Sequence, residues 1–295
     1  MRDQAQRLRE LAARARAEDG ETAPALASPP RRVLAVASGK GGVGKTSLVA
    51  NLGAVLARRG RRVTVLDADF GLANLDILLN LNPPRNLGHL LRGEARAEEV
   101  VVEASPGLRV ISGASGVQAL ADLGGEERRG LLEALAPLTD GQDFLLLDAA
   151  AGIGRNVVDL CRAAREVLLV TNAEPTSLTD AYGLAKVVWA QDPGVEVRLV
   201  VNGVAGAGEG QAVHARLDEV VMRFLRRRLA YLGHVARDEH VGRSARRQAP
   251  FVLAYPRCAA SRCVEALAEA LLESAPPPAE EGFWERLLGR QKEER

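Results

Sequence analysis

Residues 32–47 read RVLAVASGKGGVGKTS. The first seven residues are a short apolar run, which predicts a buried strand, and the glycines follow it directly. Residues 46–60 then repeat apolar side chains at helical spacing and end at a glycine. Between the predicted strand and helix, the pattern G-x-x-x-x-G-K-[ST] of phosphate-binding loops is matched by Gly39, Gly44, Lys45 and Thr46.

Backbone N–H groups in such a loop, together with the helix N-terminus, attract anionic phosphates. In this pattern the lysine contacts the β- and γ-phosphates and the hydroxyl that follows it binds Mg²⁺. We therefore expect Lys45 and Thr46 to have these two roles. The nucleotide is expected to lie along Gly39, Lys40, Gly41, Gly42, Val43, Gly44, Lys45, Thr46 and Ser47.

The loop contains a second lysine, although lysine is rare in this chain. Of 39 lysines and arginines, four are lysines: Lys40, Lys45, Lys186 and Lys292. Two of them fall within six residues of the loop. This indicates that the loop requires a compact ammonium group on a flexible stem, where the wide planar guanidinium of arginine does not fit.

The rest of the chain alternates between two patterns, which predicts an α/β fold. Short apolar runs lie at 32–38, 62–69, 107–113, 143–150, 166–173 and 195–203. Helical patterns lie between or after them at 126–138, 155–164, 178–190, 209–229 and 261–273. This alternation is typical of a doubly wound, mostly parallel sheet flanked by helices on both faces.

Composition limits the possible classes of function. The chain has 295 residues, a net charge of +1 and 47% hydrophobic residues, so no overall positive charge points to nucleic acid. No run of 18 apolar residues or signal peptide is found. The three cysteines are few and unpatterned, and Cys258-x₄-Cys263 without partner ligands is weak evidence for a metal site. We expect a reduced, cytoplasmic protein.

Carboxylates follow two of the predicted strands. LLLDAAAG ends a strand at Asp148 and places Gly152 four residues later. A carboxylate there suits Mg²⁺ held through water, and a glycine there lets a backbone N–H approach a γ-phosphate. Asp67 and Asp69 follow the second strand, where they could hold metal-bound water and orient the attacking water. The alternative is that this pair caps a turn.

The stretches KGGVGKTS, LDADFGLANLD and LLLDAAAG together resemble the MinD/ParA class of deviant P-loop ATPases, over about residues 33–273. The resemblance implies a SIMIBI-class fold and the use of ATP and Mg²⁺. It implies that Lys40 reaches across a face-to-face homodimer to the partner's ATP, like an arginine finger in trans. It also implies that Asp69 positions the hydrolytic water, while Asp67 supports a metal held by Thr46 and Asp148. A solvated loop lysine is the alternative for Lys40.

The same resemblance extends to the adenine site. Asn202 follows a strand where this class uses an amide to read adenine. The segment GHVARD resembles the adenine rim, which would be formed by Ala236, Arg237 and Asp238, although the class usually has proline where this chain has Ala236. Glu174 matches a position near the dimer interface, and a solvated loop glutamate is the alternative.

Both ends of the chain are expected to act outside the ATPase domain. We predict an N-terminal helix at 1–19, a linker at 20–30, the ATPase domain at 31–273, a linker at 274–281 and a C-terminal helix at 282–291. Residues 3–9, DQAQRLR, resemble the activator motif of the FlhG family of flagellar-number ATPases. The resemblance implies that Gln4, Leu8 and Leu11 contact an FlhF-type GTPase and stimulate it. The alternative is a disordered segment.

The C-terminal helix is expected to have one apolar face, formed by Phe283, Trp284, Leu287 and Leu288. This resembles the membrane-targeting tail of MinD and FlhG proteins. It implies that the ATP-bound dimer lies at the inner face of the cell membrane, where two tails add avidity. The alternative is a helix that packs on its own core.

The favoured interpretation is an ATPase switch that controls flagellar number and placement. Flagellar switch components or a flagellar transcription regulator are possible further partners. A partition ATPase on DNA is the main rival, with Arg226, Arg227, Arg228, Arg243, Arg246 and Arg247 as its basic surface, but solvated helix faces explain these residues better and DNA is not expected. An iron–sulfur carrier and a passive ATP-binding scaffold are further rivals.

Overall fold

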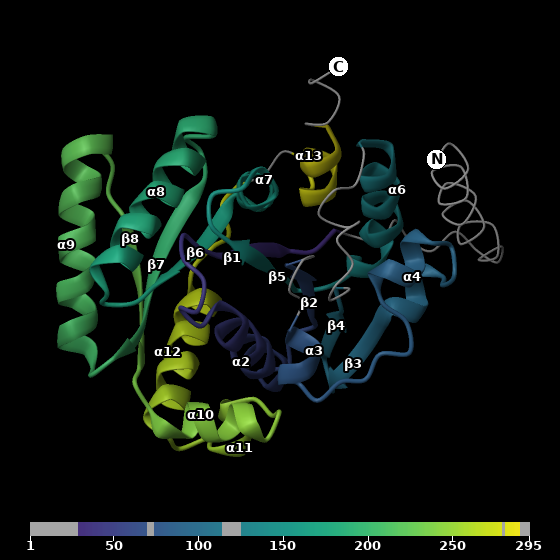
Figure 1. Cartoon of the computed structure of the whole chain (residues 1–295), viewed down its shortest axis with the longest axis horizontal. Helices are drawn as coiled ribbons and strands as arrows, with labels where there is room; N and C mark the ends of the chain where they lie inside the picture. The colour runs from purple at the N-terminus through teal and green to yellow at the C-terminus, as the bar shows by residue number, and fades with distance from the viewer. Residues whose placement is uncertain (1–28, 70–73, 114–124, 279–280, 290–295) are drawn as a thin grey trace.

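The structure, a computed structural model, describes residues 29–69, 74–113, 125–278 and 281–289 (Figure 1). Its centre is an eight-stranded sheet with the strand order β3-β4-β2-β5-β1-β6-β7-β8. The strands are β1 (Arg32–Ser38), β2 (Val63–Ala68), β3 (Val101–Ser105), β4 (Leu108–Ile111), β5 (Phe144–Ala151), β6 (Glu166–Thr171), β7 (Glu196–Val204) and β8 (Ala230–Ala236).

All paired strands are parallel except β3, which runs antiparallel to β4 at one edge. The central strand β1 is buried along its whole length, which explains its continuous apolar sequence. The strand order places β1 between β5 and β6, so three loops converge at the carboxyl edge of the sheet. This edge is where ligands bind in open α/β sheets.

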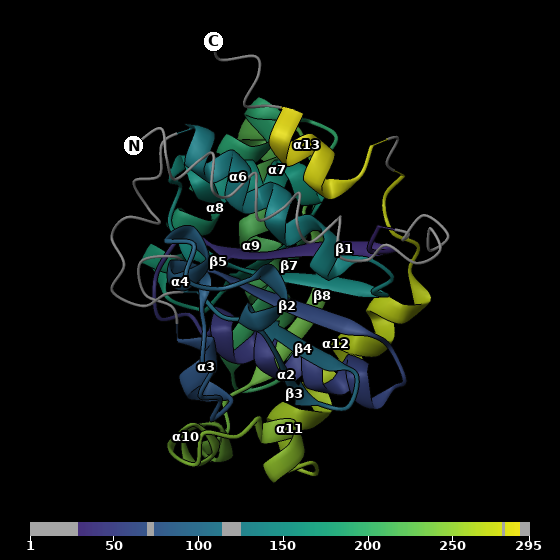
Figure 2. The same ribbon diagram turned by 90° about the vertical axis from the view of Figure 1, so that its right-hand side faces the viewer.

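Helices cover both faces of the sheet (Figures 1 and 2). One face packs against α2 (Lys45–Arg58), α11 (Phe251–Ala254) and α12 (Ala259–Glu273). The other face packs against α6 (Gly125–Leu135), α7 (Arg155–Ala164), α8 (Pro175–Gln191) and α9 (Ala207–Leu225). Shorter elements are α3 (Leu75–Leu78), α4 (Leu87–Leu91), η1 (Ala97–Val100), η2 (Ala136–Thr139), α10 (Glu239–Arg246) and α13 (Phe283–Gly289).

The predicted α/β class, six of the strands and the main helices are confirmed, and the differences have local causes. The edge strands β3 and β8 were not predicted, because β3 is short and β8 contains Gly233 and His234. The helix predicted at 209–229 ends at Leu225, since Arg226 adopts a left-handed conformation with φ 56° and stops it. The predicted N-terminal helix and most of its linker lie outside the described residues.

The C-terminal helix forms as predicted, but its apolar face is not exposed. In α13, Phe283, Trp284 and Leu287 are buried against the core on the α6–α7 side of the sheet, and Leu288 packs partly against it. The indole Nε1 of Trp284 donates to the Thr139 hydroxyl at 2.7 Å. In this conformation the prediction of an exposed membrane face is wrong, because burial on the core competes with burial in lipid for the same side chains.

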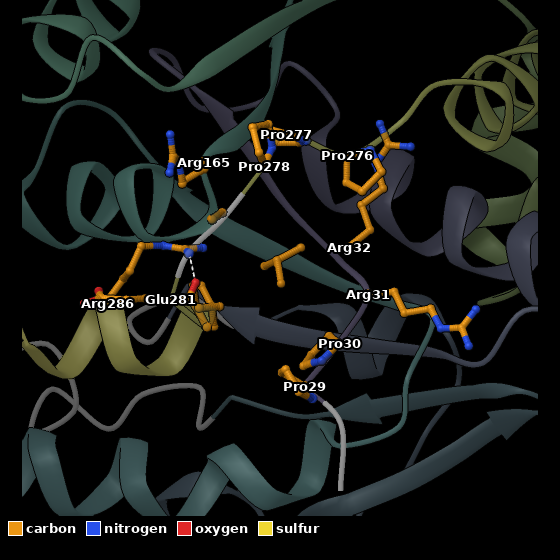
Figure 3. A pocket seen from close by; sticks show the side chains of 14 residues that line it. Pro29, Pro30, Arg31, Arg32, Arg165, Pro276, Pro277, Pro278, Glu281 and Arg286 are labelled. Carbon is orange, nitrogen blue, oxygen red and sulfur yellow. Dashed lines mark hydrogen bonds between the residues drawn. The ribbon is translucent and has the colours of Figure 1, made fainter. Parts of the chain in front are cut away.

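A pocket of about 420 Å³ lies at the base of α13, between the start of β1 and the proline-rich linker (Figure 3). Pro29 and Pro30 line it on one side and Pro276, Pro277 and Pro278 on the other. The two described ends of the chain therefore lie at the same corner of the molecule. None of the described helices is long and apolar enough to cross a membrane.

Candidate functional site: a phosphate loop at the carboxyl edge of the sheet

The glycine loop joins the end of β1 to the start of α2 and depends on glycine at three positions. Gly42 and Gly44 have φ of 77° and 94°, in the left-handed region that side chains rarely adopt. A Cβ on Gly39 would lie 2.1 Å from the carbonyl oxygen of Asp180. This close approach to α8 explains why the loop cannot carry a side chain there.

Lys45 and Thr46 lie at the first turn of α2. Lys45 is only 8% exposed, and its charge acts on Asp148. The Thr46 side chain hydrogen-bonds to Asp148. The backbone of Ser47 anchors the same turn, because its carbonyl accepts a hydrogen bond from Asn51, whose Oδ1 in turn accepts from the N–H of Val252 at 3.0 Å. The structure thus brings together the lysine, hydroxyl and carboxylate that the pattern predicts.

Asp67 and Asp148 are paired neighbours on β2 and β5. Burial, and then the negative charge of Asp148, raise the pKa of Asp67 from 3.8 to about 7, although N–H groups of Leu75 and Asp69 oppose this. Burial raises the pKa of Asp148 to about 6, against hydrogen bonding from Thr46 and the charge of Lys45. Two buried carboxylates side by side are costly when both are ionised, so this pair favours a bound cation.

The residues at this pair fit Mg²⁺. Asp148 Oδ1 is buried and has no hydrogen-bond partner within the described part of the chain, so it leaves one oxygen free to accept a ligand. Carboxylate and hydroxyl oxygens are the donors that Mg²⁺ prefers. When bound, the ion would be held by Thr46, Asp67 and Asp148 and would offset the negative charge of the phosphates and carboxylates. Asp69 lies beside the pair, with its N–H on Asp67 Oδ1 at 3.2 Å.

Gly152 lies where a γ-phosphate contact was predicted, but its N–H is engaged. It donates to the carbonyl of Ser38 at 2.8 Å and so continues the hydrogen bonding between β5 and β1 beyond the strands. Its φ of 101° requires glycine. A contact with phosphate would therefore require this N–H to change partner.

Lys40 is held by its own chain. Its Nζ donates to Glu174 Oε2 at 2.7 Å and to the Thr176 hydroxyl at 3.0 Å, at the start of α8. The hydrogen bond and charge of Lys40 lower the pKa of Glu174. The prediction that Lys40 reaches a second copy stays a prediction. In the single chain this lysine has a partner and is ordered.

A pocket of about 380 Å³ adjoins the glycine loop. It is lined by Gly42, Val43, Asn172, Ala173, Glu174, Asn202, Gly203 and Arg237. Asn202, which was expected to read adenine, donates its amide to the Val43 carbonyl at 2.7 Å and so also supports the loop. Asn172 was not predicted. It follows β6 as Asn202 follows the core of β7, and polar residues at strand ends were the signal that could have found it.

The predicted adenine rim is only partly present. Arg237 lines the pocket, but Ala236 and Asp238 are not among its lining residues. Asp238 instead caps α10 and accepts N–H groups from His240 and from Ala260 in α12. Although partial burial favours the neutral acid, these hydrogen bonds lower the pKa of Asp238. Its carboxylate therefore joins two helices, and the prediction that it contacts nucleotide has no support.

Asp238, His240 and Cys258 have ligand atoms within 4.8 Å of one another. The lone pairs of the group already accept N–H donors, since the Cys258 sulfur accepts from Ser261 at 3.4 Å in the same way as Asp238 accepts from its neighbours. Two helix N-termini also meet there, and their positive ends disfavour a cation. The cluster is explained as a pair of helix caps.

The arginines of the DNA interpretation do not form one free surface. Arg227 donates to the Pro193 carbonyl and lies over the Trp189 ring, and Arg228 pairs with Asp218 at 2.6 Å. Arg243 pairs with Glu239 within α10. The structure thus gives most of these side chains partners within the chain.

The comparisons with known proteins agree with this geometry. Residues 34–251 match the family model described as the CobQ/CobB/MinD/ParA nucleotide binding domain. The chain belongs to this family. The match includes the glycine loop, the Asp67–Asp148 pair and the pocket, so the site described above is the nucleotide site of that domain.

Two curated relatives cover nearly the whole chain. It is 41% identical over 88% of its length to antiactivator FleN of Pseudomonas aeruginosa, covering 94% of that protein. It is 32% identical over 87% of its length to the flagellum site-determining protein YlxH of Helicobacter pylori, covering 90% of it. Among solved structures, the cell division ATPase MinD of Pyrococcus furiosus is 28% identical and superposes with a TM-score of 0.68, over 82% of this chain and 99% of that one.

The predicted MinD/ParA class, its flagellar branch and its fold are confirmed by these comparisons. The family domain supports nucleotide binding, in agreement with the predicted ATP and Mg²⁺. The similarity to MinD of Pyrococcus horikoshii, which was solved with Mg-ADP, is 23% in sequence with a TM-score of 0.69 and supports the fold alone. The individual roles assigned to site residues remain predictions.

Proposed function

We propose that this protein is a Mg²⁺-dependent ATPase of the FleN/YlxH type that regulates flagellar number and placement. The observation that carries the proposal is a complete phosphate loop beside a buried carboxylate pair, in a chain 41% identical to FleN over most of its length. Lys45 and the loop N–H groups hold the phosphates, and Asp69 orients the attacking water. Mg²⁺ supplies charge neutralisation when it is bound.

The proposed cycle depends on an ATP-dependent homodimer. Lys40 lies 39% exposed on the loop, and its partners Glu174 and Thr176 lie at the same surface. Exposed ion pairs are weak, of the order of 0–1 kcal/mol, so the Lys40–Glu174 pair can exchange for a phosphate of a second copy at little cost. The lysine then stabilises the transferred phosphoryl group in trans.

The proposed membrane contact uses α13 and requires its release from the core. The same three buried side chains, Phe283, Trp284 and Leu287, cannot be buried on the core and in lipid at once. Undocking exposes them and opens the proline-lined corner (Figure 3). Membrane residence is therefore an equilibrium between two sites for one helix face.

Two further surfaces are proposed for partners. Gln4, Leu8 and Leu11 stimulate an FlhF-type GTPase by resemblance. On α9, Val220 and Phe224 are 38% and 63% exposed, with Arg223 over the Phe224 ring at 5.4 Å. An apolar pair one helical turn apart with a guanidinium beside it suits an acidic amphipathic segment of a flagellar partner.

Vesicle co-sedimentation with Mg-ATP and with Mg-ADP, together with phosphate release, tests the proposal. We expect turnover, and sedimentation only with ATP. Turnover that never depends on vesicles or dimerisation contradicts the membrane cycle, and no phosphate release in any condition indicates a passive scaffold. Salt-dependent binding to unspecific duplex DNA favours the partition function instead.

The GTPase role has its own test. A peptide of residues 1–20 should accelerate GTP hydrolysis by an FlhF-type GTPase. The matched variants are Gln4→Ala, which should mainly lower the stimulated rate, and Leu8→Ala, which should weaken binding. The absence of stimulation by the unmodified peptide removes the activator role and leaves the ATPase proposal intact.

A further inference from the structure

One short helix connects the phosphate site with the dock of the tail. α7 begins after Gly152 and Gly154 and spans 10 residues, about 15 Å. At its C-terminal end the Ala163 carbonyl accepts two hydrogen bonds from Arg286 of α13, from Nε at 2.8 Å and from Nη2 at 2.5 Å. Figure 2 shows α13 lying beside α6 and α7.

The helix is suited to move as a unit. Six of its ten residues are buried in the same core cluster that includes Phe283, Trp284 and Leu287. Its N-terminal end is not anchored in this way, because a Cβ built on Gly152 or Gly154 would meet no atom within 4 Å. The packed end is the end that carries the tail, and the glycine end faces the phosphates.

The N–H of Gly152 can satisfy only one strong acceptor. In the structure that acceptor is the carbonyl of Ser38, at 2.8 Å. A γ-phosphate bound at the loop presents a charged acceptor, and hydrogen bonds to charged groups are roughly twice as strong as neutral ones. The phosphate therefore competes with Ser38, and a change of partner at Gly152 displaces the first turn of α7, two residues further along.

We propose that α7 is the lever that releases the tail: transfer of the Gly152 N–H from Ser38 to the γ-phosphate shifts α7 and undocks α13 within one protomer, before a dimer forms. This rests on the proposed function in that ATP binds the loop and α13 can leave its dock. Dimerisation then contributes avidity between two released tails and is not the trigger.

Trp284 reports the state of the tail without vesicles. The chain has two tryptophans, so Trp189→Phe leaves Trp284 as the sole emitter. Acrylamide quenching is measured for the full chain with Mg²⁺ and either ADP or a non-hydrolysable ATP analogue. The same measurement on Lys40→Ala, at a concentration where light scattering shows monomer, separates release from dimerisation. The unmodified chain minus Trp284→Phe repeats the measurement if Trp189→Phe does not fold.

We expect the ATP analogue to increase quenching of Trp284 severalfold in both the parent chain and monomeric Lys40→Ala. An increase that occurs only when the dimer forms overturns the lever, because the second copy is then the trigger. Equal quenching with both nucleotides also overturns it. Increased quenching without vesicle binding supports the lever and contradicts the proposed membrane role.

Contacts at the packed end supply a second test. Arg286→Gln and Thr139→Val each remove one hydrogen bond of the dock, so quenching should be high with ADP as well as with the ATP analogue. Arg162→Gln is the matched control, since Arg162 lies on α7 but bonds to Gln191 of α8 at 2.8 Å. It should keep the difference between nucleotides. Nucleotide-dependent quenching that survives in Arg286→Gln and Thr139→Val shows that these contacts do not hold the tail and contradicts the mechanism.

Discussion

At the scale of single residues, the chemistry of the site follows from two pairs of charges. Lys40 pairs with Glu174 on the surface, where the interaction is weak and reversible. Asp67 and Asp148 are buried side by side, where like charges are costly. The exposed pair can change partner during a cycle, while the buried pair stays in place and requires a cation.

Lys40→Ala should bind nucleotide with little change, because the loop N–H groups and Lys45 remain. ATP-dependent dimerisation should be lost, and turnover should fall by roughly 10³-fold, the scale of a missing arginine finger. Light scattering and phosphate release measure the two effects. Glu174→Gln is the control, since it frees the lysine without removing it and should keep the dimer. A stable, active dimer of Lys40→Ala contradicts the role in trans.

The carboxylate pair predicts a pH dependence of Mg²⁺ binding. The pKa of Asp67 is raised to about 7 and that of Asp148 to about 6, both above 3.8, so lowering the pH through these values protonates them in the folded chain. Mg²⁺ binds the ionised form, and its affinity should therefore fall as the pH is lowered from about 8 to 6. Calorimetric titration of Mg²⁺ with ADP measures this. Asp67→Asn should flatten the dependence above pH 6, and an unchanged profile in that variant contradicts the assignment.

The same shifts affect stability in the opposite direction. Without Mg²⁺, the folded chain holds protons that the unfolded chain releases above pH 4. The contribution of the pair to the free energy of unfolding is therefore most favourable at low pH and is lost as the pH rises through about 6 to 7. Denaturation at pH 5.5 and pH 8 with and without Mg²⁺ measures this, and Mg²⁺ should restore stability mainly at pH 8. Asp67→Asn should reduce the pH dependence, and equal dependence in both chains contradicts it.

At the scale of elements, α13 shows how one amphipathic helix acquires two possible locations. Seven residues are too short to form a stable helix alone in water, so the helix needs either the core or a lipid surface. The proline-rich linker, Pro276–Pro278, lets it leave without disturbing α12. This separation means that the tail and the ATP site can be changed independently.

Deletion of residues 276–295 should abolish vesicle binding and leave ATP turnover in solution intact. It should also lower the free energy of unfolding, because burial of each large apolar side chain is worth about 1.5–3 kcal/mol and the α6–α7 face becomes exposed. Co-sedimentation and chemical denaturation measure the two effects. A chain with Leu288→Ser alone is the milder control, as this side chain is only partly buried. Unchanged co-sedimentation after deletion means that α13 is a structural helix.

At the scale of the whole molecule, one buried network joins distant parts of the chain. Arg32, at the start of β1, forms two hydrogen bonds with Glu166 of β6, at 2.8 and 2.6 Å. It also donates to the carbonyls of Leu271 and Ser274 at the end of α12. The sheet and the helix before the tail linker are therefore fixed to each other at this corner.

Arg32→Met should destabilise the protein by about 3–5 kcal/mol, because it leaves Glu166 buried and without its main partner. Chemical denaturation measures the loss. Arg32→Met combined with Glu166→Leu should recover much of it, since no uncompensated charge remains. If the single and double variants are equally unstable, the loss arises from the α12 contacts and not from the ion pair.

The sequence by itself determined the glycine loop, the six inner strands and the principal helices that flank them, because strands buried on both faces must be continuously apolar and a phosphate loop has a local pattern. It also indicated Asp67, Asp69 and Asp148 as strand-end carboxylates. These features depend on residues close together in the chain, or on patterns that burial imposes on every parallel sheet.

Only the tertiary structure decided where Asn172, Asp238 and the face of α13 lie. Asn172 enters the pocket because β6 and β7 are neighbours, and Asp238 turns away from it because two helix N-termini supply its hydrogen bonds. The apolar face of α13 is the same in sequence whether it meets lipid or protein. The structure buries it because α6, α7 and the Thr139 hydroxyl form a complementary dock, and those contacts come from residues more than a hundred positions away.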